Sequence, residues 1–473
     1  MRTFETDVQQ LKYKVLKAVA SHVLEDNMNN CYYDIPHEII QGKKATMRCC
    51  VYKERAIVQE RVHNILEDSD HVIQVIDIAC DECPVDRYSV NSSCRGCLAH
   101  RCMNVCPRNA ISKDDNGRAK IDPEKCIHCG RCANACPYGA ITENIRPCER
   151  SCKIGAMRIN DQQKAEIDYD KCINCGACVY QCPFGAVVDH SYMVDAMRLV
   201  ESADRRGYYA VAVIAPAVAA QFPKANFGQV KAALRSFGFH DVVEAALGAD
   251  MVTKKESQEL AEKGFLTSSC CPAFVRYIRQ HVPEMAEHIS HNLSPMAEVC
   301  RYIKENSAWP VKTVFLGPCT AKKYEQTLPT VSPWVDCVIT FEELQAMLDA
   351  AGLPPEEQEE MPVDDASYYG RIFARSGGLT EAVAQSVKEQ KLDVEVKPAV
   401  CNGIEACKVA LLKAKMGRLA ENFIEGMACE GGCIGGAGAT SHMPKDRMTV
   451  DKYGKESRKE SINMSINSYQ TKF

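Results

Sequence analysis

The stretch "KCIHCGRCANACPYGA" (125–140) is repeated with few changes as "KCINCGACVYQCPFGA" (171–186). Both copies read C-x2-C-x2-C-x3-C-P, a run whose first three thiolates lie on a tight loop and converge on one iron–sulfur cluster. The fourth cysteine starts the following helix and, in bacterial two-cluster ferredoxins, binds the other cluster. The repeat therefore predicts a ferredoxin-like α+β module with at least two [4Fe-4S] clusters.

The crossing rule gives each cluster three cysteines from one run and one from the other. We expect the first cluster to be held by Cys126, Cys129, Cys132 and Cys182. The second is then held by Cys172, Cys175, Cys178 and Cys136. Zinc is the alternative, but two runs that each end in Cys-Pro are typical of iron–sulfur clusters.

Eight more cysteines of this region follow a less regular pattern. Cys94, Cys97, Cys102 and Cys106 form a stretched copy of the run, whereas Cys148 and Cys152 form a copy that lacks its opening pair. The same rule predicts a third cluster on Cys94, Cys97, Cys102 and Cys152. It leaves Cys80, Cys83, Cys106 and Cys148 for a fourth, with zinc or unligated thiols as open alternatives for all eight.

The composition of the whole chain favours metal or redox chemistry. It has 473 residues, 28 cysteines and a net charge of −5. We expect a cytoplasmic protein, because no signal segment and no long apolar run is visible, and cysteines in a reducing compartment seldom form disulfides. The charge is spread without long blocks of one sign, which argues against a nucleic-acid-binding face.

The sequence predicts four parts. Residues 1–79 form a helical N-terminal segment, and residues 80–190 form the ferredoxin-like module. Residues 191–442 form an α/β domain, because apolar strands such as "YYAVAVI" (208–214) alternate with helical patterns such as "FGQVKAALRSFGF" (227–239). Residues 443–473 are polar and are expected to be a mobile tail or a surface strap.

Three segments of the α/β domain carry cysteines in loops rich in glycine and proline. They are "LTSSCCPAFV" (266–275), "LGPCTAKKYE" (316–325) and "FIEGMACEGGCIGGAG" (423–438). Together they supply Cys271, Cys319, Cys429 and Cys433. Four cysteines from three distant loops are suited to hold a buried cubane in an α/β core.

These segments resemble the three signatures of the iron-only, or [FeFe], hydrogenases: T-S-C-C-P, P-C-x-x-K and E-x-M-x-C-x-x-G-C-x-x-G-G. The matches are "TSSCCP" (267–272), "PCTAK" (318–322) and "EGMACEGGCIGG" (425–436). The resemblance extends from about residue 208 to 438, and a ferredoxin-like module is a usual companion. It implies a hydrogenase domain of two α/β lobes.

The resemblance implies an H-cluster, a [4Fe-4S] cubane joined to a two-iron unit with CO, cyanide and a dithiolate. Matching positions place the cubane on Cys271, Cys319, Cys429 and Cys433, and Cys433 also bridges to the two-iron unit. Lys322 matches the lysine that binds a cyanide, Pro216 and Ala217 match the loop beside the other cyanide, and Met427 matches a methionine near the dithiolate. Dedicated maturation proteins are expected to install the two-iron unit.

A proton relay is also implied. Cys270 matches the thiol that passes protons to the dithiolate amine, and Ser290, Glu256 and Glu259 match the other relay positions. The two glutamates are i and i+3 on a predicted helix, so they share a face. A solvated helix face rich in Lys and Glu is the alternative interpretation.

Several positions depart from the family pattern. Gly317, Phe274 and Met296 stand where Met, Trp and Gln are usual, and "GGAGAT" (435–440) and "FARSGG" (373–378) replace usual loops. These departures resemble the divergent branch often called group B. Residues around a metal site tune its potential and access, so rate and direction are affected first.

The expected function is the reversible interconversion of H2 with protons and electrons, with electrons passing along the clusters to a ferredoxin or similar soluble carrier. A hydrogenase-like iron–sulfur scaffold or assembly protein is one alternative, against which Cys270 and Lys322 speak. An H2 sensor would need an added signalling module, for which no room remains. A plain electron carrier would not need the α/β domain.

Overall fold

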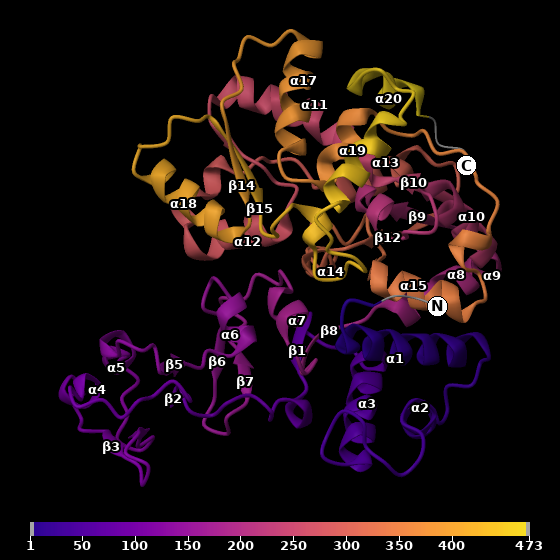
Figure 1. Cartoon of the computed structure of the whole chain (residues 1–473). Helices are drawn as coiled ribbons and strands as arrows, with labels where there is room; N and C mark the ends of the chain where they lie inside the picture. The colour runs from indigo at the N-terminus through magenta and orange to yellow at the C-terminus, as the bar shows by residue number, and fades with distance from the viewer. Residues whose placement is uncertain (1–3, 470–473) are drawn as a thin grey trace.

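The computed structural model describes residues 4–469, and its first part is a group of three helices. These are α1 (Asp7–Leu24), α2 (Cys31–Ile39) and α3 (Val51–Leu66). Thr6 caps α1 by accepting a hydrogen bond from the backbone N–H of Gln9. In Figure 1 the three helices lie below the α/β body, and α1 packs along α15 (Phe341–Ala350).

The segment predicted as helical over 1–79 contains one exception. β1 (Ile73–Val75) pairs antiparallel with β8 (Val187–Asp189), near the end of the cysteine-rich part. The end of the helical segment therefore belongs to the next unit of the fold.

The cysteine-rich part consists of two lobes. The distal lobe, residues 88–143, contains β2 (Tyr88–Val90), α4 (Arg101–Asn104), β3 (Ile111–Lys113), β4 (Ala119–Ile121), α5 (Arg131–Ala135) and β5 (Ile141–Glu143). The proximal lobe, residues 72–83 and 147–189, contains β1, η1 (Asp77–Ala79), α6 (Pro147–Ser151), β6 (Met157–Ile159), β7 (Ala165–Ile167), α7 (Ala177–Gln181) and β8.

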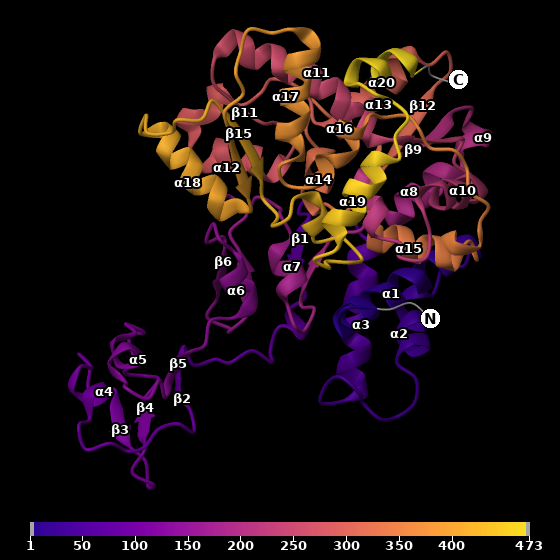
Figure 2. The same ribbon diagram turned by 45° about the horizontal axis from the view of Figure 1, so that its top comes forward.

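The distal lobe is inserted into the proximal lobe. Its first and last strands, β2 and β5, pair antiparallel and so close it on itself, whereas β6–β7 and β1–β8 build the proximal lobe. Figure 2 shows the distal lobe projecting away from the rest of the molecule, with α6 and α7 between it and the body.

The α/β body has two parallel sheets. The first has the order β10 (Asp241–Glu244), β9 (Tyr209–Ile214), β12 (Val311–Gly317), β13 (Cys337–Thr340). The second has the order β11 (Leu266–Thr267), β15 (Phe423–Met427), β14 (Pro398–Asn402). Strands β9 and β12 read as apolar runs because helices cover both faces of a parallel sheet. The prediction of a two-lobed α/β domain is confirmed.

The helices of the body connect these strands. They are α8 (Met193–Glu201), α9 (Ala203–Arg206), α10 (Phe227–Phe237), α11 (Ala245–Lys263), α12 (Pro272–His281), α13 (Pro295–Asn306), α14 (Thr320–Glu325), α15, α16 (Tyr368–Arg371), α17 (Gly378–Gln390) and α18 (Ile404–Lys415). Short 3-10 turns are η2 (Pro216–Ala220), η3 (Pro283–His288), η4 (Pro355–Glu357), η5 (Ile372–Ala374) and η6 (Cys433–Gly435).

Of the two expectations for the residues after 442, the mobile tail is wrong, whereas a surface strap fits the structure. The segment forms α19 (Asp446–Lys455) and α20 (Ile462–Ser468), and both pack on the body. Tyr453 is 6% exposed and donates a hydrogen bond to Glu244, which also binds the Arg371 guanidinium at 2.8 and 3.0 Å. A polar sequence is thus held by buried polar contacts that an apolar periodicity does not reveal. The end of this segment, 470–473, lies outside the described residues.

Among residues 4–469, no helix combines the length and the apolar character needed to cross a membrane.

Candidate functional site

Four cysteines of the body lie where strands of both sheets end. Cys271 follows β11 and precedes α12, Cys319 follows β12 and precedes α14, and Cys429 and Cys433 follow β15. Ligands of open α/β sheets bind at the carboxyl ends of strands. The structure brings together the four cysteines that the three sequence segments supplied.

Burial and mutual proximity dominate the chemistry of these thiols. Burial, together with nearby thiols, raises the pKa of Cys319 to about 11 and that of Cys433 to about 12. Burial likewise raises the pKa of Cys429, with Cys319 and Cys271 as close neighbours. Thiols with such pKa values stay protonated at neutral pH, and a bound metal is what stabilises the thiolates.

The donor set fits a cubane. Within residues 4–469, no group of three or more His, Cys, Asp or Glu side chains is close enough to hold a single metal ion. One zinc ion draws its ligand sulfurs to about 2.3 Å from a common centre, whereas a cubane binds each cysteine through a different iron. Four cysteines from three loops suit the second arrangement.

Close backbone approach holds these loops together. Gly432 has φ +91°, and a Cβ on it would lie 2.6 Å from the backbone N of Ser376. The turn η6 at Cys433 contacts both η2 and η5. Pro216 and Ala217 belong to η2, so the structure places them beside the Cys433 turn.

Met427 and Lys322 also lie at this site. Met427 is 2% exposed and packs in one apolar cluster with Cys270 and Phe373. The Nζ of Lys322 donates to the carbonyl oxygen of Cys270 at 3.2 Å and to Oε2 of Glu325 at 2.6 Å. Burial opposes the charge of Lys322, but Glu325 keeps its pKa above the ordinary value. The ammonium has three donors, so one is left for an anionic ligand.

The predicted relay residues form a line from this site toward the surface. Cys270 is 8% exposed, and burial, followed by the charge of Glu256, raises its pKa well above the ordinary value. Oε1 of Glu256 accepts hydrogen bonds from the backbone N–H and the hydroxyl of Ser269, both at 3.2 Å. Burial raises the pKa of Glu256 to about 7, and Ser269 and Ser290 oppose that rise.

The outer part of the line reaches solvent at Glu259. The hydroxyl of Ser290 donates to Oε2 of Glu259 at 3.0 Å. Oε1 of Glu259 accepts from Nζ of Lys263 at 2.7 Å and lies 3.4 Å from Nδ1 of His291, whose side chain is 76% exposed. The Glu256 side chain is buried and that of Glu259 is 11% exposed, so neither belongs to a fully solvated helix face.

The sixteen cysteines of the two lobes lie in four groups of four. In the distal lobe, one small cavity is lined by Cys94, Cys97, Cys102 and Cys136, and another by Cys106, Cys126, Cys129 and Cys132. In the proximal lobe, Cys152 is a close neighbour of Cys172, Cys175 and Cys178. Cys148 has a pKa raised by burial to about 12, with Cys182, Cys80 and Cys83 around it.

This grouping corrects the pairing predicted from chain order. Cys182 does not join Cys126, Cys129 and Cys132, Cys136 does not join the Cys172 run, Cys152 does not join the Cys94 run, and Cys106 does not join Cys80, Cys83 and Cys148. The physical reason is the insertion of the distal lobe. Within each lobe, the fourth cysteine of one run joins the three cysteines of the other run. Cys80 and Cys83 supply the opening pair that is missing from the run of Cys148 and Cys152.

The proximal lobe touches the body site directly. Burial raises the pKa of Cys175 to about 12, and Cys271 is among its neighbouring thiols. The hydroxyl of Thr320 donates to the carbonyl oxygen of Asn174 at 2.8 Å. A Cβ on Gly176 would lie 2.5 Å from Cβ of Ala437, so the loop has no space for a side chain there.

Family models match this arrangement. Residues 208–437 match the model described as iron only hydrogenase large subunit, C-terminal domain. Residues 93–140 and 118–183 match models of the 4Fe-4S dicluster domain. The chain belongs to the iron-only hydrogenase family. It combines a hydrogenase domain that holds an H-cluster with a ferredoxin-like module that holds additional [4Fe-4S] clusters.

Three curated relatives of the chain are hydrogenases or hydrogenase subunits. The chain is 31% identical to iron hydrogenase 1 of Clostridium pasteurianum over 386 residues, which cover 70% of this chain and 66% of the relative. It is 28% identical to the periplasmic [Fe] hydrogenase large subunit of Nitratidesulfovibrio vulgaris over 45% of this chain and 62% of the relative. It is 29% identical to the NADP-reducing hydrogenase subunit HndD of Solidesulfovibrio fructosivorans, over 54% of this chain and 53% of that subunit. The chain thus spans between about half and two thirds of the length of these relatives.

Among the solved structures that are similar to this chain is a variant of the [FeFe]-hydrogenase HydA1 from Chlamydomonas reinhardtii. It is 19% identical, with a TM-score of 0.49, over 57% of this chain and 90% of that one.

Several residues around the hydrogenase site were not found from the sequence. Ser269 binds Glu256, and Glu325 pairs with Lys322. Asn292 donates through Nδ2 to Glu259 and to Ser290, at 3.0 Å in both cases. The sequence signals were weak: Ser269 adjoins the cysteine pair, Asn292 lies two residues after Ser290, and Glu325 is i+3 from Lys322.

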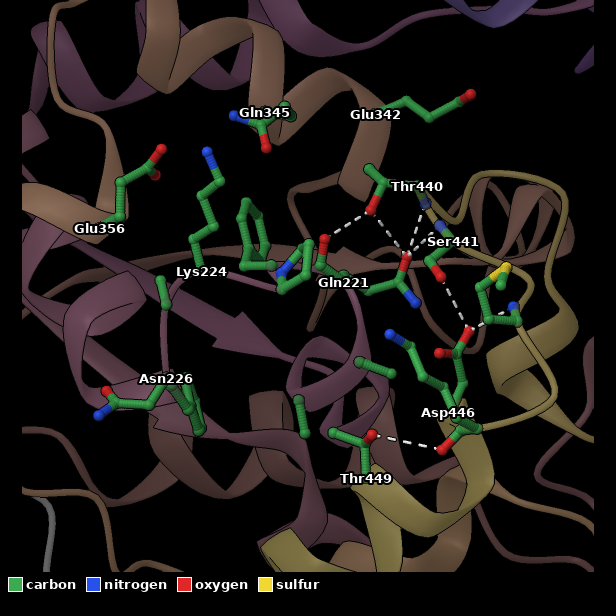
Figure 3. A pocket seen from close by; sticks show the side chains of 18 of the residues that line it. Gln221, Lys224, Asn226, Glu342, Gln345, Glu356, Thr440, Ser441, Asp446 and Thr449 are labelled. Atoms are coloured by element: carbon green, nitrogen blue, oxygen red, sulfur yellow. Dashed lines mark hydrogen bonds between the residues drawn. The ribbon is translucent and has the colours of Figure 1, made fainter. Parts of the chain in front are cut away.

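A cavity of about 900 Å³ lies close to the hydrogenase site but contains none of its cysteines. Figure 3 shows Gln221 reaching toward Thr440 and Ser441 at its wall. Oε1 of Gln221 accepts from the backbone N–H of Thr440 at 2.6 Å, and the Thr440 hydroxyl donates to the Gln221 carbonyl at 2.7 Å. These bonds tie the end of η2 to the segment after Cys433, so this wall braces two loops of the site.

Proposed function

We propose that the chain catalyses the reversible interconversion of H2 with protons and electrons. The observation that carries the proposal is the placement of Cys270, Glu256, Ser290 and Glu259 between the cysteine site and exposed Lys263 and His291, with the Ser290 hydroxyl donating to Glu259 at 3.0 Å. A scaffold or an electron carrier has no need of buried groups that pass protons. A hydrogenase requires them, because its protons must cross the protein.

The residues of the site have different proposed roles. We assign Cys271, Cys319, Cys429 and Cys433 to the cubane of the H-cluster, which when bound supplies the redox chemistry. Lys322 offers a charge-assisted hydrogen bond to an anionic ligand of that group, and Pro216, Ala217 and Met427 exclude water beside it. Cys270 holds the proton nearest the site.

The rest of the relay is proposed to act by hydrogen-bond exchange. Glu256 takes or gives a proton at its carboxyl group, and a pKa near 7 suits both directions at neutral pH. Rotation of the Ser290 hydroxyl connects Glu256 with Glu259, which exchanges the proton with Lys263, His291 or solvent.

Electrons are proposed to leave through four [4Fe-4S] clusters, one for each group of four cysteines. The group of Cys152 and the Cys172 run lies next to the H-cluster site because Cys175 neighbours Cys271. The two groups of the distal lobe lie farthest out (Figure 2). We propose a ferredoxin or similar carrier as the partner, maturation proteins as the source of the two-iron unit, and the cytoplasm as the location.

Infrared spectroscopy of anaerobically matured protein tests the proposal. CO and cyanide stretching bands that shift under H2 are expected in the wild type. Cys270→Ala is expected to keep these bands and to lose H2 turnover, because the group is still bound while the proton path is broken. Matured protein without such bands would favour the scaffold interpretation, and bands without turnover in the wild type would favour a sensor.

A further inference from the structure

Three arginine side chains are buried around one of the two cysteine groups of the proximal lobe. This group, called the Cys80 group below, consists of Cys80, Cys83, Cys148 and Cys182. Arg146 is 4% exposed, Arg61 is 5% exposed, and the side chain of Arg48 is 7% exposed. A guanidinium keeps its charge in proteins, and a buried charge is costly unless an opposite charge lies beside it. These three cations therefore need an anion close by.

Two of the three arginines have no carboxylate partner within residues 4–469. Nη2 of Arg61 donates to the carbonyl oxygen of Gly185 at 2.5 Å, and Nη1 of Arg146 donates to that of Gln163 at 2.9 Å. A carbonyl oxygen accepts a hydrogen bond but has no net charge, so it does not balance a buried cation.

The carboxylates near Arg61 are bound by lysines. Nζ of Lys12 lies 2.6 Å from Oδ1 of Asp189 and 2.6 Å from Oε2 of Glu342. Nζ of Lys323 lies 2.9 Å from the other carboxylate oxygen of Asp189. These acids neutralise the two lysines, which leaves the charge of Arg61 to another anion.

Two buried donors of these arginines have no hydrogen-bond partner within residues 4–469: Nη1 of Arg48 and Nε of Arg61. Nη1 of Arg48 lies 3.6 Å from Glu82 and 3.9 Å from Asp81, too far for a hydrogen bond, and both carboxylates also pair with Lys53. A buried donor without a partner is costly, so these N–H groups indicate an acceptor that the polypeptide does not supply.

The same side chains are neighbours of the ligand thiols. The charge of Arg61 interacts with Cys182, and the charges of Arg146 and Arg48 interact with Cys83. A cubane bound by four thiolates carries a net negative charge, and its sulfurs accept hydrogen bonds. A cluster on the Cys80 group therefore supplies both the missing anion and the missing acceptor.

The other cysteine groups have less buried positive charge around them. Every Lys and Arg side chain of the distal lobe, residues 88–143, is exposed. In the other group of the proximal lobe, the charge of Arg276 interacts with Cys172, and Nη2 of Arg276 donates to the carbonyl oxygen of Tyr169 at 3.2 Å. Three buried guanidiniums at one cluster site, against one arginine at its neighbour, make the two sites electrostatically unequal.

We propose that Arg48, Arg61 and Arg146 are the counter-ions of a [4Fe-4S] cluster on the Cys80 group and raise its reduction potential above that of the other cluster in the proximal lobe. Reduction adds one electron to the cluster, and no bond forms or breaks. Adjacent positive charge and N–H donors available to its sulfurs both stabilise the reduced, more negative state. The inference rests on the proposed function, because it assigns one cluster of the electron path a place where an electron is retained.

Neutral variants of the full chain, loaded with its cubanes, test the proposal. Arg61→Gln and Arg48→Gln each remove one of the three charges, whereas Arg61→Lys keeps the charge. Arg276→Gln removes the cation beside the other cluster of the lobe and so identifies that cluster. The matched control is Arg158→Gln, an arginine of β6 in the same lobe whose side chain is 63% exposed.

Redox titration followed by electron paramagnetic resonance measures the potential of each cluster, and iron analysis detects lost clusters. In Arg61→Gln and Arg48→Gln, we expect the ratio of reduced to oxidised cluster at a given potential to fall about tenfold for one cluster, a shift of about 59 mV. Arg61→Lys should shift that step less, and Arg158→Gln should leave every step unchanged. The step that moves in Arg276→Gln should lie at a lower potential.

Unchanged titrations of Arg61→Gln and Arg48→Gln with all iron retained would overturn the proposal, as would an equal shift in Arg158→Gln. A step that moves in Arg276→Gln and lies at the higher potential would refute the order of the two clusters. Loss of about four iron atoms in Arg61→Gln but not in Arg61→Lys would support the counter-ion role, and Arg48→Gln then reports the potential. The titration needs no H2 turnover, so a chain that does not convert H2 contradicts the proposed function and still gives this result.

Discussion

The distal lobe and the α/β body hold cysteine sites of the same chemistry in opposite ways. The apolar cluster of the distal lobe has four buried members, Tyr88, Ile111, Cys132 and Ile141, whereas that of the body is many times larger. Since a small unit buries too little surface to fold unaided, metal clusters have to supply the missing stability. The body folds around its own core and presents a prepared site. The distal lobe therefore needs its bound clusters in order to fold, whereas the α/β body folds first and its loops then form the cluster site.

Removal of iron is expected to produce the largest difference between the two regions. In cluster-free protein, backbone amides of residues 88–143 should lose protection against hydrogen exchange, because cluster ligation replaces a core there. Amides of β9 and β12 should stay protected. Hydrogen exchange followed by mass spectrometry compares the two, and equal protection in both regions would contradict the distinction.

Glu256→Gln is expected to lower H2 turnover by about 10²–10⁴-fold, because it removes a proton carrier from the line inside the body. Iron content and ferredoxin binding should stay at wild-type values, since the distal lobe is untouched. The matched control is Glu262→Gln, an exposed residue of the same helix. Near-normal turnover of Glu256→Gln with viologen would exclude the relay.

Excision of the distal lobe sharpens the comparison further. Tyr88 pairs with Glu143, so a short Gly-Ser linker can replace the residues between these strand ends. We expect the product to lose about eight iron atoms per chain, those of two cubanes, and to keep turnover with viologen while losing it with ferredoxin. If cysteines crossed between the lobes, the proximal clusters would be lost too, and iron analysis would reveal it.

The pH dependence of turnover should report the protonation of the Glu256 carboxyl group, which is buried in the body. Burial raises the pKa of Glu256 from 4.5 to about 7. H2 production needs the protonated carboxyl group and should therefore fall as pH rises through about 7, whereas H2 oxidation should rise through the same range. The folded state binds this proton more tightly than the unfolded state, so stability falls between these pKa values as pH rises. Rate profiles of Glu262→Gln should keep this step, and those of Glu256→Gln should lack it.

Tyr453→Phe is expected to have the smallest effect. It removes the hydrogen bond to Glu244 and should cost about 1–2 kcal/mol of the stability of the body. Thermal unfolding measured on the holoprotein should shift down by a few degrees, about 2–4 °C. Tyr52→Phe, at a residue 78% exposed, is the control, and an equal shift there would show that α19 adds nothing specific.

The sequence predicted the local features of both regions well. The runs at Cys126 and Cys172 have fixed spacing, and the loops at Cys271, Cys319 and Cys433 carry glycine, proline and cysteine together, so each marks its own site. The assignment of the fourth cysteines failed because it depended on which strands pair, and β2–β5 closure is a property of the whole chain. The C-terminal helices were missed because Tyr453 and Ser465 are held by hydrogen bonds to Glu244 and Asp250, which no periodicity encodes.

The insertion of one lobe into the other also sets an order of assembly during synthesis. The ligands of the distal lobe, from Cys94 to Cys136, are the first complete sets to leave the ribosome, although Cys80 and Cys83 emerge before them. The proximal sets close when Cys182 appears, and the body site closes last, at Cys433. Because domains fold as they emerge, N-terminal ones first, a nascent chain can load its outer clusters while the catalytic pocket has yet to be translated. The chain would then receive its electron path before the centre that the path serves.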